Sequence, residues 1–370
     1  MPEIRVAESL AEADRGQWQA LFPGALEDYD YLAAVEAAGL DDFRWRYALA
    51  YQGGELVAAA PAFITEYPLE TTLTGPGRHL AQGLRKAFPD ALTLRLGCLG
   101  SPCTETAQFG FKPGLSEPRR AELLTRLIQG FERAARRDRC GLFGAKDVTE
   151  ADLALWTRAA QPLGYHPMPS LPTAQLDIDF PDMDAYFARL SHATRKDMRR
   201  KLRAAAGLRV EVRESIDDVL DQVMALYAET LARADMSFEE LTPAYFQGVL
   251  AKMPGRAFAV LYFDGDALLG FNLLIQDGET LLDKFFCMEA ERGRPLNLYF
   301  VSWFTNVRLC LERGLKLYQS GQAAYDVKLK LGSRLIRTSI CFRHRNALVN
   351  GALQLVAPLF VPDPVLKLAA

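Results

Sequence analysis

The sequence predicts an α/β protein, in its α+β form, with two tandem domains that each contain a mixed, mostly antiparallel sheet flanked by helices. Its 370 residues exceed what a single hydrophobic core normally fills, so two domains are expected. An internal repeat points the same way, because residues 51–64 can be laid over residues 262–275 with matching tyrosine, glycine and isoleucine. Each copy reads as a strand, a glycine turn and a second strand. Duplication of one domain accounts for both observations.

A proline-rich segment at residues 167–172 separates the two predicted domains. Its prolines interrupt both helical and strand periodicity. We therefore expect a first domain at residues 1–170, a second at 171–345, and an apolar C-terminal helix and tail at 346–370.

Periodicity assigns the elements of the second domain. Residues 173–180 and 208–212 alternate apolar and polar side chains, as half-exposed strands do. Residues 182–190 read as a capped helix, and the basic helix 191–206 stops at Gly207. The other predicted elements are the helices 216–233 and 243–252, the hairpin 258–275, the strand 280–287, the loop 292–295, the helix 296–313 and the strand 315–319.

Composition limits the partners and the compartment. The formal charge of −3 and the isoelectric point near 5.9 give no overall attraction to nucleic acid, so no DNA partner is expected. The six cysteines are scattered without a CxxC pair, which favours reduced, buried thiols and no zinc site. The N-terminus lacks the apolar core of a secretory signal, and the apolar stretch 295–311 falls short of the roughly 20 residues that span a bilayer. A cytoplasmic protein is expected.

A group of polar residues follows the predicted strand 315–319. Gly321 supplies a turn, and Tyr325, Asp326 and Lys328 come after it. Polar groups gathered at a strand end commonly form the sites of α/β sheets. We therefore predict a site at this strand end; an ordinary structural ion pair is the alternative.

The order of elements from 258 to 319 resembles the acyl-CoA-binding half of a GNAT acyltransferase. Three further features of the chain resemble the FemAB-like branch of that superfamily. They are Leu317-Tyr318-Gln319-Ser320-Gly321-Gln322, the spaced Lys328 and the later Cys341-Phe342-Arg343-His344. The resemblance implies two adjacent strands that splay apart and free backbone N–H groups for the pantetheine arm of acyl-CoA, the co-substrate. It also implies that a helix N-terminus receives the pyrophosphate and that no metal is required.

The segment before helix 296–313 is the corresponding anion site. Its predicted donor-binding residues are Arg292, Gly293, Arg294 and Asn297, and Pro295 suits the first helical position. The spacing departs from the glycine signature of the superfamily, and the FemAB-like branch includes enzymes that draw on aminoacyl-tRNA. A tRNA partner is therefore the alternative donor, and a plain surface turn is the alternative structure.

The strand-end residues have defined roles in such a reaction. Tyr325 could protonate the departing thiolate, and Asp326 could accept the proton of the attacking amine. Lys328 and Gln322 are predicted to bind the substrate.

His192 is a second candidate base, because the ordinary pKa of histidine suits proton removal from an ammonium. A helix-terminal or surface histidine is the alternative. The helix that follows carries six cations within residues 195–203. Arg195 and Lys196 are predicted to bind phosphate groups of CoA, tRNA or a lipid, whereas a solvated helix surface is the alternative.

Asp283 and Lys284 are consecutive charges in an apolar strand. Such charges are costly unless they are paired or face a cleft, and strand alternation sends the two to opposite faces of the sheet. One of them is therefore expected to face the site, Asp283 as a catalytic residue or Lys284 as a substrate-binding residue.

The C-terminal segment bears on the acceptor. Residues 348–360 form an apolar helical segment after Arg343-His344-Arg345, which can rest on a bilayer or dock on the core. The inner-leaflet membrane surface is therefore a candidate partner, which would make the protein peripheral. The tail resembles those of GNAT-related bacterial ceramide synthases. Apolar side chains around the predicted cleft could house an alkyl chain, or could simply form the core: Phe285, Phe286, Tyr299, Phe300, Trp303 and Phe304.

The preferred prediction is an N-acyltransferase that moves an acyl group from acyl-CoA to a long-chain, sphingoid-type amino lipid. The second domain would bind the donor and carry catalysis, and the first would be structural or acceptor-binding. One alternative is a FemAB-like aminoacyl transferase that uses aminoacyl-tRNA on a peptidoglycan precursor. The other is a non-catalytic binding protein with a degenerate GNAT fold.

Overall fold

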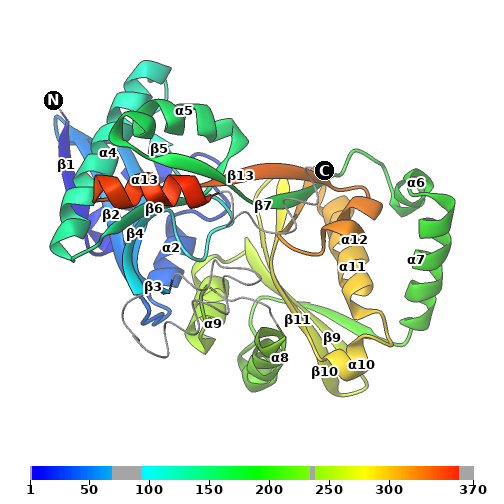
Figure 1. The fold of residues 1–370 in the computed structure, drawn as a ribbon. Helices are drawn as coiled ribbons and strands as arrows, with labels where there is room; N and C mark the ends of the chain where they lie inside the picture. The colour runs from blue at the N-terminus through cyan, green and yellow to red at the C-terminus, as the bar shows by residue number, and fades with distance from the viewer. Residues whose placement is uncertain (1, 69–92, 234–237, 358–370) are drawn as a thin grey trace, which may run out of the picture. The chain divides into compact units, whose positions relative to one another are not determined.

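The structure is a computed structural model that describes residues 2–68, 93–233 and 238–357 (Figure 1). The chain forms two compact units. Unit 1 comprises Met1–Pro23, Leu40–Pro172 and Arg337–Ala370, and unit 2 comprises Gly24–Gly39 and Thr173–Ile336. The units are therefore not the continuous ranges 1–170 and 171–345, because each takes a segment from the other half of the chain.

Unit 1 contains a mixed sheet with the strand order β1-β2-β3-β4-β6-β13, and β5 pairs with β3. β4 and β6 are parallel, and the other pairs are antiparallel. The strands are β1 (Glu3–Ala7), β2 (Phe43–Gln52), β3 (Glu55–Pro68), β4 (Thr93–Leu99), β5 (Gly110–Phe111), β6 (Leu142–Thr149), the first part of β7 (His166–Asp177) and most of β13 (Arg334–His344).

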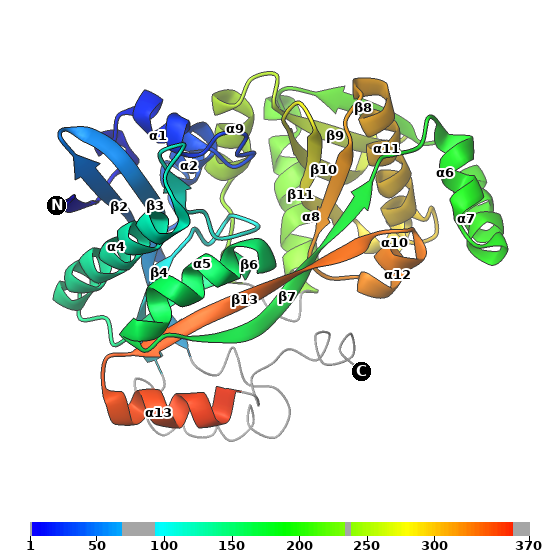
Figure 2. The same cartoon turned by 90° about the horizontal axis from the view of Figure 1, so that it is seen from above.

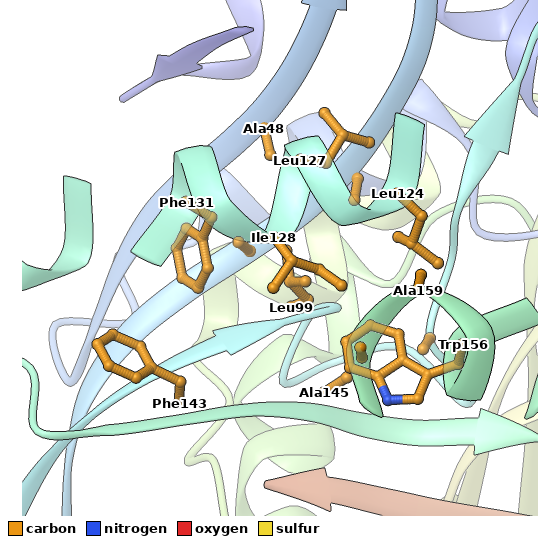
Figure 3. Close-up of a cluster of buried hydrophobic side chains, with 14 of the residues drawn as sticks. Ala48, Leu99, Leu124, Leu127, Ile128, Phe131, Phe143, Ala145, Trp156 and Ala159 are labelled. Atoms are coloured by element: carbon orange, nitrogen blue, oxygen red, sulfur yellow. The ribbon is translucent and has the colours of Figure 1, made fainter. Parts of the chain in front are cut away.

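Helix α4 supplies much of the core of unit 1. Its apolar residues recur every three or four positions, so Leu124, Leu127 and Phe131 share one face. This face packs into a cluster with Phe143 of β6 and Trp156 of α5 (Figure 3). The helices of unit 1 are η1 (Leu10–Glu12), α1 (Arg15–Leu21), α4 (Glu117–Arg137), α5 (Glu150–Ala160), η3 (Gln161–Leu163) and α13 (Ala347–Val356).

The strands of unit 2 pair in the order β8-β9-β10-β11-β12-β7. Here β11 and β12 are parallel and the other pairs are antiparallel. The strands besides β7 are β8 (Arg209–Arg213), β9 (Ala257–Asp264), β10 (Ala267–Gln276), β11 (Thr280–Met288) and β12 (Leu317–Gly321).

Helices cover both faces of the unit 2 sheet. α11 packs on β11 and β12, whereas α8 packs on β10 and β11 from the other face (Figures 1 and 2). α2 packs against α9, although it comes from the N-terminal part of the chain. The helices are α2 (Tyr29–Glu36), α6 (Met183–Arg189), α7 (His192–Ala204), η4 (Asp217–Val219), α8 (Leu220–Ala232), α9 (Pro243–Lys252), α10 (Ala290–Gly293), α11 (Leu298–Arg313) and α12 (Tyr325–Lys330).

The two sets of strands repeat one pattern of pairing. In spatial order, β1-β2-β3-β4-β6-β13 corresponds to β8-β9-β10-β11-β12-β7. In both sets the fourth and fifth strands are parallel to each other, and every other neighbouring pair is antiparallel. The hairpins β2–β3 and β9–β10 are the two copies of the sequence repeat. This confirms the predicted fold class, and it supports the duplication. The sixth strands are exchanged: residues 173–177 of β7 complete unit 2, and residues 337–344 of β13 complete unit 1.

The proline-rich segment was wrongly predicted to break the chain's regular structure. Residues 167–172 lie inside β7, which runs from His166 to Asp177. Proline is tolerated in a strand where its missing N–H is not needed for the ladder. The predicted helices 182–190 and 191–206 are confirmed as α6 and α7, with Asp182 and Ser191 as their N-caps.

The C-terminal helix and the cysteines also have structural counterparts. α13 covers Ala347–Val356, and Leu359, Phe360, Pro362, Asp363 and Pro364 lie outside the described residues. All six cysteines are buried and unbridged. Within the described residues, every helix is too short or too polar to cross a bilayer.

Candidate active site

The parallel pairing of β11 with β12 stops after three residue pairs. Thr280, Leu281 and Leu282 pair with Leu317, Tyr318 and Gln319, and the described register ends there. β11 continues to Met288, where it pairs with β10 alone. From Phe285 to Met288, therefore, the described register pairs β11 with β10 only. An early end of pairing is compatible with the splayed strands that the GNAT resemblance implies, which stay a prediction.

A β-bulge lies directly before this stretch of β11. Leu273 pairs with Phe285 and Leu274 pairs with Asp283, so Lys284 is the extra residue of β11. A bulge bends its strand and redirects side chains. Asp283 contacts side chains of α11, whereas Lys284 reaches Glu27 before α2. The predicted placement of the two charges on opposite faces is confirmed.

Asp283 accepts three hydrogen bonds from neighbouring elements. Asn272 Nδ2 donates to Oδ1 at 2.7 Å, while Asn306 Nδ2 and the Tyr318 hydroxyl donate to Oδ2 at 3.1 Å and 2.9 Å. Burial, and then the charge of Asp283, raises the pKa of Tyr318 well above its ordinary value. Tyr318 therefore stays protonated and donates. The cluster connects β10, β11, α11 and β12 where the described pairing of β11 with β12 ends.

Further hydroxyl groups surround this cluster. Ser302 and Tyr262 both donate to Asn272 Oδ1, the latter at 3.3 Å. The Tyr299 hydroxyl and Asn306 Oδ1 are buried and have no hydrogen-bond partner within the described residues. Burial, with the charge of Asp283 as the second cause, raises the pKa of Tyr299. A buried polar atom without a partner is costly.

Lys284 forms a buried ion pair on the other face of the sheet. Its Nζ lies 2.6 Å from Glu27 Oε1, and the two side chains are only 7% and 5% exposed. The ammonium also lies 5.4 Å from the centre of the Tyr31 ring. The charge of Lys284 is therefore matched inside unit 2.

The turn between β11 and α11 differs from its predicted form. Residues 290–293 form the short helix α10, and α11 begins at Leu298 rather than at 296. Pro295 is therefore not the first helical position. Asn297 has φ of 56° and occupies the N-cap, because the chain must turn sharply before the helix starts.

The four predicted donor-binding residues all lie on this turn. Arg292 lies 3.1 Å from Asp264 and 3.9 Å from Glu289. Arg294 is exposed, Gly293 is buried, and Asn297 Nδ2 donates to the backbone carbonyl of Pro295. Two guanidinium groups thus precede the N-terminus of a 16-residue helix, an arrangement that favours anions.

The predicted strand-end residues lie on a helix. β12 covers 317–321 rather than 315–319, and Tyr325, Asp326 and Lys328 belong to α12. Tyr325 is buried and Asp326 is exposed. Lys328 is buried and donates to the carbonyls of Ser320, Gly321 and Gln322 at 2.6, 3.1 and 3.0 Å. It holds the chain that leaves β12, while Gln322 is half-buried in that turn.

The predicted residues of α7 lie on another element of unit 2. His192 is the first residue of α7 and is exposed, as is Lys196. Arg195 donates to the backbone carbonyls of Phe187 and Ala188 at the end of α6. Among the other cations of this helix, Lys201 contacts Asp197 and lies 3.6 Å from the Phe300 ring centre. Several of these charges therefore have structural partners.

The structure also describes a surface pocket, but it lies elsewhere in unit 2. The pocket has a volume of about 310 Å³ and lies between the end of β7, the α6–α7 corner and the end of α12. None of the predicted site residues lines it. The apolar residues expected around the cleft are also divided: Phe285 packs on Tyr227 and Phe246, whereas Trp303 and Phe304 are fully buried.

Sequence reasoning missed Glu27 and the amide and hydroxyl partners of Asp283. Asn272 and Asn306 interrupt apolar runs, and Ser302 lies one helical turn before Asn306. That interruption was a usable signal, because a buried amide needs a partner. Glu27 had no comparable signal, since its partner is 257 positions away.

Comparison with known proteins bears on the fold of the region that contains these residues. Residues 192–329 match the acetyltransferase (GNAT) domain family. The matched range includes β11, α11, β12 and most of α12. No curated protein matches the chain.

Solved structures with the same fold cover nearly the whole chain. FemX has a TM-score of 0.60 at 13% identity, with 96% of this chain and 100% of that chain covered. L-PGS from Bacillus licheniformis has a TM-score of 0.56 at 12% identity, with 94% and 97% covered. A tandem GNAT protein from the clavulanic acid biosynthesis pathway has a TM-score of 0.55 at 16% identity, with 93% and 99% covered. At these identities the likeness concerns the fold.

Proposed function

We propose that the protein is an N-acyltransferase that moves an acyl group from a thioester, acyl-CoA, to a primary amine. The observation that carries the proposal is the end of β11–β12 pairing after Leu282 and Gln319, together with the start of α11, where Leu298 lies against Gly270 opposite the far end of β11. Two features suit an activated acyl carrier: the edge of β11 at residues 285–288, which lies past the described pairing with β12, and a helix N-terminus preceded by arginines. Both lie in the range that matches the GNAT domain.

The donor would bind along β11 and at the start of α11. N–H and C=O groups of β11 beyond Asp283 would pair with the amide groups of the pantetheine arm. The phosphates would lie at the N-terminus of α11, where the helix dipole and the exposed Arg294 favour negative charge. Arg292 of α10 would also bind the phosphates, and its ion pair with Asp264 would then weaken.

The transfer itself needs a base, an oxyanion site and an acid. The acceptor ammonium first loses a proton, and its lone pair then attacks the thioester carbonyl. Backbone N–H groups stabilise the oxyanion until the C–S bond breaks and the thiolate leaves with a proton. We assign the base to the exposed Asp326 and the acid to Tyr325, which are adjacent on α12; His192 is the second candidate base.

Three predicted site residues are better suited to supporting this geometry. Asp283 joins four elements through its hydrogen bonds, and Lys328 holds three carbonyls of the 320–322 turn. Lys284 is bound to Glu27. We therefore propose that these residues fix the positions of β11 and of the end of β12 in the conformation that accepts the donor.

For the acceptor we propose a long-chain amino lipid of the sphingoid type. Support comes from the aromatic cluster of Phe286, Tyr299 and Phe300 near the start of α11 and from the apolar side chains that α13 exposes. A cytoplasmic protein that is peripheral to the membrane fits such a substrate.

A second candidate is aminoacyl transfer from charged tRNA to a peptidoglycan precursor. The observation in its favour is the fold shared with FemX over 96% of this chain, because the sequence resembles the FemAB-like branch as well. The cations of α7 would then contact the nucleic acid.

One assay separates these candidates. The purified protein is incubated with sphinganine and a long-chain acyl-CoA, and free thiol and amide are followed by colorimetry and mass spectrometry. Parallel reactions replace the donor by charged tRNA. We expect Asp326→Asn to lower turnover about a hundredfold, the lower limit for loss of a general base. Lys330→Gln, an exposed change on the same helix, should keep full activity.

The outcomes are distinct. Product from charged tRNA alone supports aminoacyl transfer. Absence of product from every donor, with binding of acyl-CoA retained, supports the non-catalytic alternative. Equal turnover of the Asp326→Asn variant would reject the assigned base but not the reaction.

A further inference from the structure

Helix α13 exposes three of its large apolar side chains. Leu348 is 86% exposed and Leu355 is 83% exposed, and Val349 is 40% exposed. Leu348 and Leu355 are seven positions apart and so lie on one side of the helix. We call these three residues the apolar face. Large apolar side chains gathered on one exposed surface commonly mark an interaction site.

The opposite side of α13 is attached to unit 1 by a polar side chain. Asn350 Nδ2 donates to the carbonyl of Gly164 at 3.1 Å, and Asn350 Oδ1 accepts from the backbone N–H of His344 at 2.8 Å. Asn350 follows Leu348 by about 200° of helix rotation. The amide contacts therefore hold the helix with Leu348 and Leu355 directed away, whereas Leu353 is half-buried.

Exposed arginines lie next to the beginning of this helix. β13 pairs with β6 so that His344 is opposite Leu142, and the N–H of Arg345 donates to the carbonyl of Gly141 at 2.9 Å. Arg345 therefore lies beside the turn that follows α4, which carries Arg139 and begins directly after Arg137, the last residue of that helix. We call these three exposed residues the arginine rim.

The rim has an excess of positive charge. Within the described residues, none of its three arginines has a side-chain ion pair. The nearby carboxylate of Glu132 is already shared by Arg136 and Arg343. α13 itself carries no charged residue. An uncharged apolar face thus adjoins a cationic edge.

We propose that unit 1 binds the surface of an anionic lipid bilayer through α13. The apolar face would enter the boundary between headgroups and acyl chains, and the arginine rim would contact the headgroup phosphates. A second copy of the chain fits less well, because a symmetric contact through this face would bring two cationic rims together. The proposal does not depend on the transfer reaction.

Vesicle sedimentation tests the proposal with the full-length protein. Phosphatidylcholine vesicles are prepared with and without phosphatidylglycerol, and the bound fraction is measured at low and physiological salt. We expect binding to the anionic vesicles only. Leu348→Ser with Leu355→Ser should weaken it at least about tenfold. Arg137→Gln with Arg345→Gln should weaken it about fivefold per arginine and reduce its salt dependence.

A control variant tests whether vesicle binding depends on this surface or falls when any exposed apolar residue is changed. Val212→Ser changes a 47% exposed valine of β8 in unit 2 and should bind as the unchanged protein does. Thermal unfolding should be unaltered in every variant, since the changed side chains are exposed. Anionic vesicles that fail to bind the unchanged protein, or that bind the double serine variant equally well, would overturn the proposal. So would a dimer in sedimentation velocity that the serine changes abolish in the absence of vesicle binding.

Discussion

At the residue scale, the burial of the charged Lys284 side chain depends on a partner from a distant part of the chain. A bulge inserts this lysine into β11, and burial would make its ammonium costly without a carboxylate. Glu27 supplies that carboxylate at 2.6 Å. Segment 24–39 is held in turn by Arg256, which contacts Asp28 and the carbonyls of Ala25 and Leu26.

Removal of one partner of this pair should therefore be severe. Glu27→Leu should lower the free energy of unfolding by about 3–5 kcal/mol, because the lysine stays buried without its carboxylate partner. Adding Lys284→Met should recover most of that loss, since two apolar side chains can replace a buried pair. Urea unfolding followed by circular dichroism measures both.

An exposed pair in the same unit provides the matched control. Lys316 and Glu279 lie 3.4 Å apart and are each 73% exposed. Glu279→Gln should change the free energy of unfolding by less than about 1 kcal/mol. If the exposed change were as costly as the buried one, or if the double variant were no more stable than Glu27→Leu, the assigned role of the buried pair would be wrong.

At the element scale, the start of α11 is set by a glycine in β10. A Cβ on Gly270 would lie 2.7 Å from Leu298 Cδ2 and 3.4 Å from the carbonyl oxygen of Cys287. Leu298 is the first residue of α11 and is fully buried. Gly270 therefore lets the first turn of the helix lie directly against the sheet, beside the proposed donor site.

Substitution at this glycine should disturb both packing and donor binding. Gly270→Ala should destabilise the protein by about 1–3 kcal/mol, as overpacking of a close-packed interior usually does. Because Leu298 must move, acyl-CoA affinity measured by calorimetry should fall as well. Gly278→Ala is the matched control, since its Cβ would meet nothing within 4 Å. Unchanged acyl-CoA affinity in a destabilised Gly270→Ala protein would argue against a donor site at the start of α11.

At the scale of the whole molecule, each unit is completed by chain from the other half. Unit 2 needs Gly24–Gly39 for Glu27 and for α2, whose Tyr31 hydroxyl lies 2.9 Å from that of Tyr245. Thr242 Oγ1 also donates to the carbonyl of Ala38. A cut at the proline-rich segment would remove all of these contacts from unit 2.

A fragment of residues 173–336 should therefore fail to unfold cooperatively. Joining residues 24–39 to it through a glycine-serine linker should restore a sigmoidal unfolding curve, because the buried Lys284 regains its carboxylate. Circular dichroism melting and urea titration compare the two fragments. A cooperative transition of equal midpoint without residues 24–39 would show that the segment is dispensable for this unit.

Local pattern was sufficient for much of the fold. Helical and strand periodicity predicted α6, α7, α9, the hairpin β9–β10 and β11, because burial of side chains leaves a 3.6-residue or two-residue signal in the sequence. The repeat at residues 51–64 and 262–275 predicted two similar sheets. Consecutive charges in an apolar run directed attention to Asp283 and Lys284, since such charges require a partner or a site, and the GNAT resemblance directed attention to the turn before α11.

Tertiary structure decided which of those charges are structural. The partners of Asp283 come from three other elements, and Lys284 finds Glu27 across 257 positions. The end of β7, which follows the strands of unit 1 in the sequence, pairs with β12 of unit 2. Most of β13, which follows the strands of unit 2, pairs with β6 of unit 1. Sequence alone determined the order and type of most elements, because those depend on neighbours along the chain. Contacts between distant segments leave no periodic signal in the sequence. Only the folded structure therefore shows which charged residues pair and to which unit β7 and β13 belong.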